Sequence, residues 1–211
     1  TRFTKDGIEE TFGVNHLGHF LMVNLLLNQA QNLKRIAVVA SDVHNPEIQS
    51  HFPAPKFEKI SELAYPNDAK VTDWEKEGNQ RYANSKFCNV LFTYQLVQEF
   101  KKTHRDHILV NAFNPGFIPG TGLGRNSSPM AHFMWFHVLP LFSRFSKAIR
   151  TADESGQALA KLISEVEVTG KYFDGLQEKP SSEASYDQVR AQRLWWRSEE
   201  LAHLKINEQI E

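Results

Sequence analysis

Two short apolar runs, each preceded by a longer segment with helical periodicity, constrain the fold most strongly. The runs cover residues 35–41 (RIAVVAS) and 107–114 (HILVNAFN), and runs of this kind bounded by charged or turn-forming residues are typical of strands buried on both faces. Before them, apolar residues recur at helical spacing over about residues 8–30 and 80–102. Because parallel strands need a crossover connection, usually a helix, this order predicts an α/β fold with a parallel sheet and helices on both of its faces.

The rest of the chain continues this alternation. Thr151 and Glu154 have the spacing of a capping box, which predicts a third helix ending near residue 164. Residues 170–175 predict a short last strand, and residues 182–204 predict a polar terminal helix that packs through its two tryptophans. Residues 42–79, rich in proline, asparagine and aspartate, predict a long loop, and loops of this length are usually functional or mobile.

Five residues are predicted to meet at one edge of this sheet. Ser41 ends the first strand, and Pro115 and Gly116 follow the second, so all three lie at the carboxyl ends of parallel strands, where ligands bind in such folds. Tyr82 and Lys86 stand four residues apart near the start of the helix that follows the loop. That spacing stacks both side chains on one helix face.

The pairing of Tyr82 with Lys86 suggests redox or proton-transfer chemistry on a carbonyl-like substrate. A free tyrosine has a pKa near 10, so half-ionisation at neutral pH requires roughly 4 kcal/mol of differential stabilisation. A fixed ammonium one helical turn away can supply part of it. The pair alone is a weak signal, because a surface tyrosine packed on a lysine stem has the same spacing. Its convergence with the strand ends favours the functional interpretation.

Composition excludes several classes of protein. The 211 residues are of one-domain size, so we expect residues 1–211 to form a single domain. A net charge of −1 gives no support for nucleic-acid binding, and none is expected. Apolar stretches of the length of a transmembrane helix are absent, and no histidine pair has convincing metal-ligand spacing, so we expect neither a membrane span nor a metal. The one cysteine, Cys88, fits a reducing compartment and is expected to be a packed, inert thiol; a cytoplasmic or membrane-associated location is favoured.

Four motifs carry a family resemblance. In chain order they are residues 14–20 (VNHLGHF), 39–41 (VAS), 82–86 (YANSK) and 114–116 (NPG), the last with Thr121 five residues after its glycine. Together they resemble the short-chain dehydrogenase/reductases, and the wording NHLGHF is typical of the branch that holds retinol dehydrogenases and light-dependent protochlorophyllide reductases. The resemblance covers nearly the whole chain. It implies a Rossmann-type doubly wound parallel sheet, of which this chain would be the C-terminal portion.

The resemblance also implies a role for each motif residue. Tyr82 would give or take the proton at the substrate, Lys86 would lower the Tyr82 pKa, and both would contact the cofactor, Lys86 through the nicotinamide ribose. Ser41 would hydrogen-bond the substrate oxygen, and Asn15 would hold a helix kink and a water that relays protons toward Lys86. Four residues after the second strand would line the nicotinamide: Pro115, Gly116, Ile118 and Thr121. The cofactor expected from this branch is NADP, with NAD left open.

The glycine-rich turn that takes the pyrophosphate in this family is not recognisable in the sequence. The run GTGLG at residues 120–124 follows Pro119, and no strand–turn–helix unit surrounds it. We therefore expect the chain to be the C-terminal portion of a longer enzyme, with the adenine and pyrophosphate sites on residues outside this sequence.

Residues 130–147 are rich in aromatic side chains and would form the substrate lid of the family. A core helix and a membrane-surface contact are the alternatives for this segment. The expected partners are therefore a small apolar substrate and no nucleic acid, with membrane contact by the lid and a homodimer left open.

The sequence thus predicts NADP(H)-dependent oxidation or reduction of a bulky apolar alcohol or carbonyl. One alternative is light-dependent reduction of a ring C=C bond in a pigment, as in protochlorophyllide reductases. A second alternative is a truncated, non-catalytic module or dimerisation partner.

Overall fold

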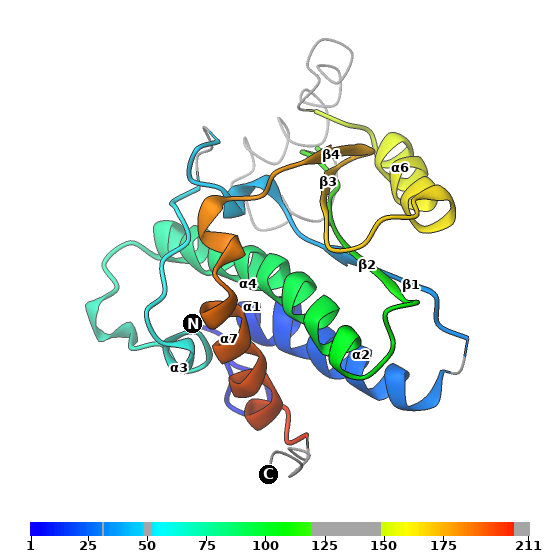
Figure 1. Ribbon diagram of the computed structural model, residues 1–211. Helices are drawn as coiled ribbons and strands as arrows, with labels where there is room; N and C mark the ends of the chain where they lie inside the picture. The colour runs from blue at the N-terminus through cyan, green and yellow to red at the C-terminus, as the bar shows by residue number, and fades with distance from the viewer. Residues whose placement is uncertain (31, 49–51, 120–148, 205–211) are drawn as a thin grey trace.

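The protein has a four-stranded sheet in the order β1-β2-β3-β4 (Figure 1). The computed structural model describes residues 1–30, 32–48, 52–119 and 149–204. The strands are β1 (Arg35–Val39), β2 (Leu109–Asn114), β3 (Tyr172–Asp174) and β4 (Gln177–Lys179). The first three are parallel, with Val39 opposite Phe113 and Phe113 opposite Phe173, and β4 is antiparallel to β3. The predicted α/β class with a Rossmann-type parallel sheet is confirmed.

Helices cover both faces of the sheet (Figure 1). One face carries α2 (Gly18–Gln29), α4 (Trp74–Lys102) and α7 (Gln188–Leu201), and the other carries α6 (Ala152–Glu165). Side chains alternate along β2 as a strand buried on both faces requires: Val110 packs with Phe92 and Leu96 of α4, and Phe113 packs with Ala158 and Leu162 of α6. These two layers are the core that holds the carboxyl edge of the sheet in place.

The helix that carries the Tyr–Lys pair begins earlier than predicted. α4 starts at Trp74 rather than near residue 80, because the Asp73 carboxylate caps it by accepting the backbone N–H groups of Glu75 and Lys76 at 3.1 and 3.0 Å. The predicted loop before it also contains short helical pieces: η2 (Asp42–His44), α3 (Ile60–Ala64) and η3 (Asp68–Lys70).

Two features near the C-terminus were not predicted. Residues 170–175 contain the expected strand, but β4 follows it through a two-residue turn in which Gly175 has φ +62°. β4 escaped prediction because its residues are polar and exposed, without an apolar face. The terminal helix also begins later than predicted: residues 183–186 form a separate short helical turn, η7 (Glu183–Tyr186), and α7 begins at Gln188.

The capping box and the packing of the terminal helix can be compared directly with the predictions. Thr151 and Glu154 cap α6 reciprocally, as predicted. Trp195 packs against Phe20 and Phe92, which confirms one of the two expected tryptophan contacts. The prediction for Trp196 is wrong: its side chain is 54 % exposed, because the next position on the helix faces outward. Cys88 is fully buried, and burial raises its thiol pKa, as an inert packed cysteine requires.

Some expectations fall on residues outside the described ranges, namely Thr121 and the lid at residues 130–147. Within the described part of the chain, no helix combines the length and apolar character that crossing a bilayer would need. Over the same residues, no group of three or more His, Cys, Asp and Glu side chains is arranged to hold a metal ion.

Candidate active site

Tyr82, Lys86 and Ser41 come together at the carboxyl end of β1. Lys86 Nζ donates a hydrogen bond to the carbonyl of Val39, the last residue of β1, at 3.2 Å. The same ammonium lies over the Tyr82 ring, 5.6 Å from its centroid. The Ser41 side chain lies close enough to the Tyr82 phenol to favour its ionised form. A phenol, an ammonium and a hydroxyl therefore share one corner of the fold.

The Ser41 hydroxyl is held by the turn that follows β1. Its Oγ accepts the backbone N–H of Val43 at 3.5 Å, which caps η2, and its O–H donates to Asp42 Oδ1 at 3.2 Å. Ser41 itself is extended, with φ −166°. The strand end and the first turn after it thus fix the position of the hydroxyl before any substrate is present.

The pKa values of Tyr82 and Lys86 differ from the expectation that the ammonium acidifies the phenol. The pKa of Tyr82 is raised, because burial and then the nearby Asp42 carboxylate outweigh the opposite effect of the Ser41 side chain. Burial also lowers the Lys86 pKa, to about 8. The expected lowering of the Tyr82 pKa is therefore wrong: Lys86 lies against the ring and donates to the Val39 carbonyl, and burial and Asp42 decide the direction.

Asn15 lies in a π-helical turn, η1 (Gly13–Leu17), between the short helix α1 (Glu10–Phe12) and α2. Its Nδ2 donates to Ser85 Oγ at 3.0 Å, and Ser85 Oγ donates to the Tyr82 carbonyl at 2.8 Å. The expected irregularity of this helix is present, and single π-turns of this kind occur often at functional sites. Asn15 reaches the backbone of the Tyr82 turn, and its role in a water relay stays a prediction.

Asn89 is a site residue that the sequence reasoning missed. Its Nδ2 donates to the Val39 carbonyl at 3.0 Å, so it shares this acceptor with Lys86. The signal was present in the sequence, because Asn89 lies three residues after Lys86, at a spacing that faces the same side of a helix.

Pro115, Gly116 and Ile118 follow β2, next to the end of β1 at the same edge of the sheet. Gly116 has φ +82°, and its N–H donates to Asn114 Oδ1 at 3.1 Å. The Pro115 carbonyl accepts Ser155 Oγ at 3.0 Å, from the first turns of α6. Arg150 packs directly on Gly116 and pairs with Asp174 Oδ1 at 2.7 Å, so this turn is held from two sides.

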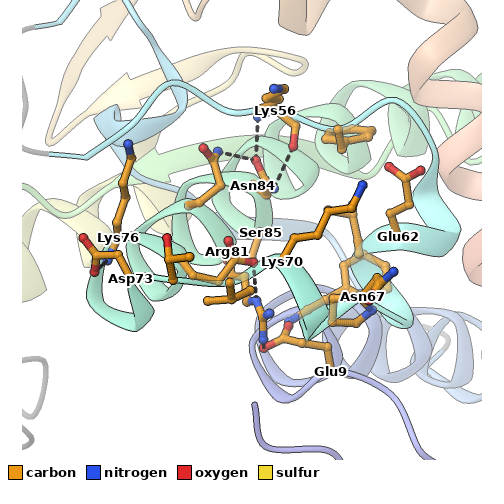
Figure 2. A pocket seen from close by; sticks show the side chains of 18 residues that line it. Glu9, Lys56, Glu62, Asn67, Lys70, Asp73, Lys76, Arg81, Asn84 and Ser85 are labelled. Atoms are coloured by element: carbon orange, nitrogen blue, oxygen red, sulfur yellow. Dashed lines mark hydrogen bonds and ion pairs between the residues drawn. The ribbon is translucent and has the colours of Figure 1, made fainter.

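A segment of the long loop covers the Tyr82 side of α4. The Phe52 ring lies 5.5 Å from the Tyr82 ring, centroid to centroid. Figure 2 shows the two hydrogen bonds that fasten this segment to the helix: Lys56 N–H to Asn84 Oδ1 at 2.7 Å and Asn84 Nδ2 to the Lys56 carbonyl at 3.0 Å. Gln80 adds a third, to the Ala54 carbonyl at 2.8 Å.

A cavity of about 600 Å³ lies beside this fastened segment (Figure 2). Lys56, Asn84 and Ser85 line it, together with Arg81, which pairs with Asp68 and Glu77 at 2.8 Å each. Tyr82 and Lys86 do not line this cavity. It is therefore a separate feature that adjoins the back of the helical turn that carries the pair.

Comparison with known proteins identifies retinol dehydrogenases and protochlorophyllide reductases among the relatives. No family model matches the chain. Retinol dehydrogenase 13 of Mus musculus is 35 % identical over 206 residues, which are 96 % of this chain and 56 % of that protein, and retinol dehydrogenase 14 of Homo sapiens is 33 % identical over 54 % of its length. Protochlorophyllide reductase of Avena sativa is 30 % identical over 96 % of this chain and 69 % of the length of that protein. The chain thus spans about half the length of the retinol dehydrogenases it matches.

A solved structure supports the same fold. The crystal structure of an uncharacterised protein from Mycobacterium paratuberculosis superposes with a TM-score of 0.61, covering 96 % of this chain and 62 % of that one. The identity is 22 %, so this likeness concerns the fold alone.

Proposed function

The chain belongs to the short-chain dehydrogenase/reductase family, and on this premise we propose that it carries the proton-transfer residues of an NADP(H)-dependent oxidoreductase. Its substrate would be a bulky, apolar alcohol or the corresponding carbonyl compound. The observation that carries the proposal is the meeting of Tyr82, Lys86 and Ser41 at one strand end, where the ammonium lies over the phenol ring and the Ser41 side chain lies close enough to influence the phenol.

In the proposed reduction, the Tyr82 phenol donates its proton to the substrate oxygen as negative charge develops there. The raised pKa of Tyr82 keeps the phenol protonated at neutral pH, which suits this direction. Ser41 donates a second hydrogen bond to the same oxygen and orients the carbonyl. In the oxidation, Tyr82 must lose its proton first, so a cationic cofactor and the Lys86 ammonium would have to offset the effect of burial.

The residues of the site fit a nicotinamide nucleotide. Lys86 uses one of its N–H donors on the Val39 carbonyl, so two remain for the ribose hydroxyls. Pro115, Gly116 and Ile118 would line the nicotinamide ring from the end of β2, with Thr121 contributing from beyond the described residues. The cofactor, when bound, supplies the hydride, and the protein supplies orientation and the proton. We favour NADP over NAD.

The substrate class follows from the relatives and from Phe52. Retinol, which the names of two relatives specify, is a bulky apolar alcohol. A substrate whose oxygen bonds the Tyr82 phenol would lie beside the Phe52 ring, which offers an apolar surface next to the reacting group. The proposed substrates are therefore retinol-like alcohols and the corresponding aldehydes.

The test is turnover of retinaldehyde with NADPH, and then with NADH, by a full-length version that supplies the adenine and pyrophosphate sites, and by its Tyr82→Phe variant. We expect the variant to lose turnover by at least about 100-fold, because general acid catalysis contributes on that scale. Binding of NADPH, followed by quenching of tryptophan fluorescence, should remain unchanged. Full turnover by Tyr82→Phe would refute the role of the phenol.

A second candidate function is reduction of a C=C bond in protochlorophyllide. The similarity to protochlorophyllide reductase of Avena sativa favours it, because this chain covers 69 % of that protein but only 56 % and 54 % of retinol dehydrogenases 13 and 14. Light-dependent conversion of protochlorophyllide by the chain, with no turnover of retinaldehyde, would decide for it. Absence of NADPH binding in the fluorescence titration would instead favour a non-catalytic module.

A further inference from the structure

We infer that His44 is a positioning residue for Ser41, acting as a neutral clamp that ties the carbonyl of Ser41 to the segment before α7. The inference rests on the proposed function, in which the Ser41 hydroxyl grips the substrate oxygen. It adds a residue that belongs to none of the motifs, and it couples the site to the C-terminal part of the chain.

The two ring nitrogens of His44 bind partners of opposite kind. Nδ1 lies 2.5 Å from the Ser41 carbonyl oxygen, and Nε2 lies 3.1 Å from the backbone nitrogen of Ser182. A carbonyl can only accept and a backbone N–H can only donate, so Nδ1 carries the proton and Nε2 offers its lone pair. One neutral tautomer alone satisfies both contacts.

Burial favours the same neutral form. His44 is 1 % exposed, and its ring packs against the Tyr172 ring of β3 at 4.8 Å between centroids. Burial lowers its pKa, against smaller effects of the Ser41 carbonyl and the Asp42 carboxylate. Protonation would put a second donor opposite the Ser182 N–H, so the contact would be lost.

The far end of the clamp is anchored to the helix that carries the Tyr–Lys pair. Ser181 Oγ bonds the Tyr94 hydroxyl of α4 at 2.6 Å, and Ser185 donates to the Ser182 carbonyl through both its N–H and its hydroxyl, at 2.9 and 2.6 Å. Ser182 is 2 % exposed. A continuous set of contacts therefore runs from α4 through Ser182 and His44 to the backbone of Ser41.

The clamp acts on Ser41 through its backbone. The Ser41 carbonyl accepts the His44 ring at 2.5 Å and the His44 backbone N–H at 3.3 Å, so this one residue holds the carbonyl twice. With the carbonyl direction fixed, the extended conformation of Ser41 is fixed as well, and so is the place of its hydroxyl beside Asp42 and near Tyr82. Loss of the ring contact should misplace the hydroxyl while leaving the cofactor contacts of Lys86 in place.

The test compares two pairs of variants. His44→Phe keeps the ring and removes both hydrogen bonds, whereas His44→Asn keeps a donor on the atom that corresponds to Nδ1. Ser182→Pro deletes one N–H at a position whose φ of −59° suits proline. Ser182→Ala keeps that N–H and removes only a hydroxyl that has no hydrogen-bond partner among the described residues.

With retinaldehyde and NADPH, we expect His44→Phe to lower kcat by about 10- to 100-fold, with the KM for NADPH within about twofold of the parent. His44→Asn should recover part of the loss, and Ser182→Pro should lower kcat more than Ser182→Ala. Equal kcat for His44→Phe and the parent, or equal losses in the two Ser182 variants, would overturn the inference.

Nitrogen NMR of the His44 ring tests the clamp without turnover, so its failure is distinguishable from failure of the proposed function. The parent should show a protonated Nδ1 and an unprotonated Nε2 at neutral pH, and Ser182→Pro should disturb the Nε2 signal while Ser182→Ala leaves it unchanged. A ring protonated on Nε2 would overturn the inference whatever the enzyme turns over.

Discussion

Lys86 and Asn89 donate hydrogen bonds to one and the same acceptor, the backbone carbonyl of Val39, at 3.2 and 3.0 Å. The carbonyl lies at the end of β1, and both donors come from consecutive turns of α4. Asn89 is 4 % exposed, whereas Lys86 is only half-buried. The buried amide therefore fixes the carbonyl against the helix, and the carbonyl in turn fixes the ammonium over Tyr82.

Replacing Asn89 should therefore act on the site through Lys86. We expect Asn89→Leu to lower kcat/KM with retinaldehyde about tenfold and the free energy of unfolding by about 1–2 kcal/mol, because one buried hydrogen bond is lost. The pH dependence of turnover is the specific readout, because burial lowers the Lys86 pKa to about 8 and a displaced ammonium would titrate in a different environment. Gln95→Leu removes another buried amide of α4, which donates to Glu99 Oε1 at 2.6 Å; it is the matched control and should leave that pH profile unchanged.

Acid should destabilise the fold through His16. Burial lowers the pKa of His16 from 6.5 to about 4, so the folded chain binds this proton at a lower pH than the unfolded chain does. The stability that this provides is fully present above about pH 6.5 and is lost as the pH falls toward 4, by roughly 3 kcal/mol. Denaturant unfolding of the chain and of His16→Gln, measured across that window, should show a flatter pH dependence for the variant.

Glutamine is the suitable replacement because it removes the titrating group and can keep the hydrogen bond of His16. His16 Nε2 bonds Ser198 Oγ at 2.9 Å, and a glutamine amide can replace that contact without titrating. His44 also has a lowered pKa and will contribute an acid loss that both proteins share. An unchanged pH dependence in His16→Gln would contradict the assignment to His16.

Residues with a local signal could be placed from the sequence. The 35–41 and 107–114 runs became β1 and β2, and the Thr151–Glu154 spacing became a capping box, because strand burial and helix capping depend on neighbouring residues. Spacing and strand ends also brought Tyr82, Lys86 and Ser41 to one place. These features need only the chain order and the rule that parallel strands end at one edge.

What the sequence could not supply depends on contacts between distant segments. The carbonyl that Lys86 binds lies 47 positions away, and the ring nitrogen that His44 offers to Ser182 spans 138 positions. The Tyr82 pKa was expected to be lowered by Lys86, yet burial and Asp42 decide it, and neither can be judged before the helix is packed. β4, with three exposed polar residues, carried no periodic signal at all.

Gly116 should tolerate no side chain, because of Arg150. A Cβ at this position would lie 2.9 Å from the Arg150 Cδ and Nη1 atoms, and φ is +82°. We expect Gly116→Ala to lower the free energy of unfolding by about 2–4 kcal/mol, the sum of backbone strain and the displacement of Arg150 from Asp174. Gly7→Ala is the matched control: its φ is +75° with no atom within 4 Å of a Cβ, so it should cost the strain alone, about 1–2 kcal/mol.

A double-mutant cycle separates the two contributions at Gly116. Arg150→Ala removes the guanidinium that the new methyl group would meet, so Gly116→Ala should cost less in that background. Equal costs of Gly116→Ala and Gly7→Ala would show that the contact with Arg150 has no influence on stability.

Asn84 should control the loop segment that covers Tyr82. Its amide accepts the Lys56 N–H and donates to the Lys56 carbonyl, and its Oδ1 also accepts Gln80 Nε2 at 3.0 Å. The side chain is 6 % exposed, so Asn84→Ala removes these bonds from a largely dry position. Amide hydrogen exchange at Lys56 and Phe57 should accelerate by about tenfold or more, because local opening no longer breaks these bonds. Phe52 then loses its fixed place against Tyr82, so the KM for retinaldehyde should rise several-fold while NADPH binding is unchanged. Lys76→Ala is the control, because it alters the adjoining cavity without removing these hydrogen bonds, and it should leave the exchange rate and the KM at the parent values. If Lys76→Ala raised the KM as much as Asn84→Ala, the effect would belong to the cavity and not to the fastened segment.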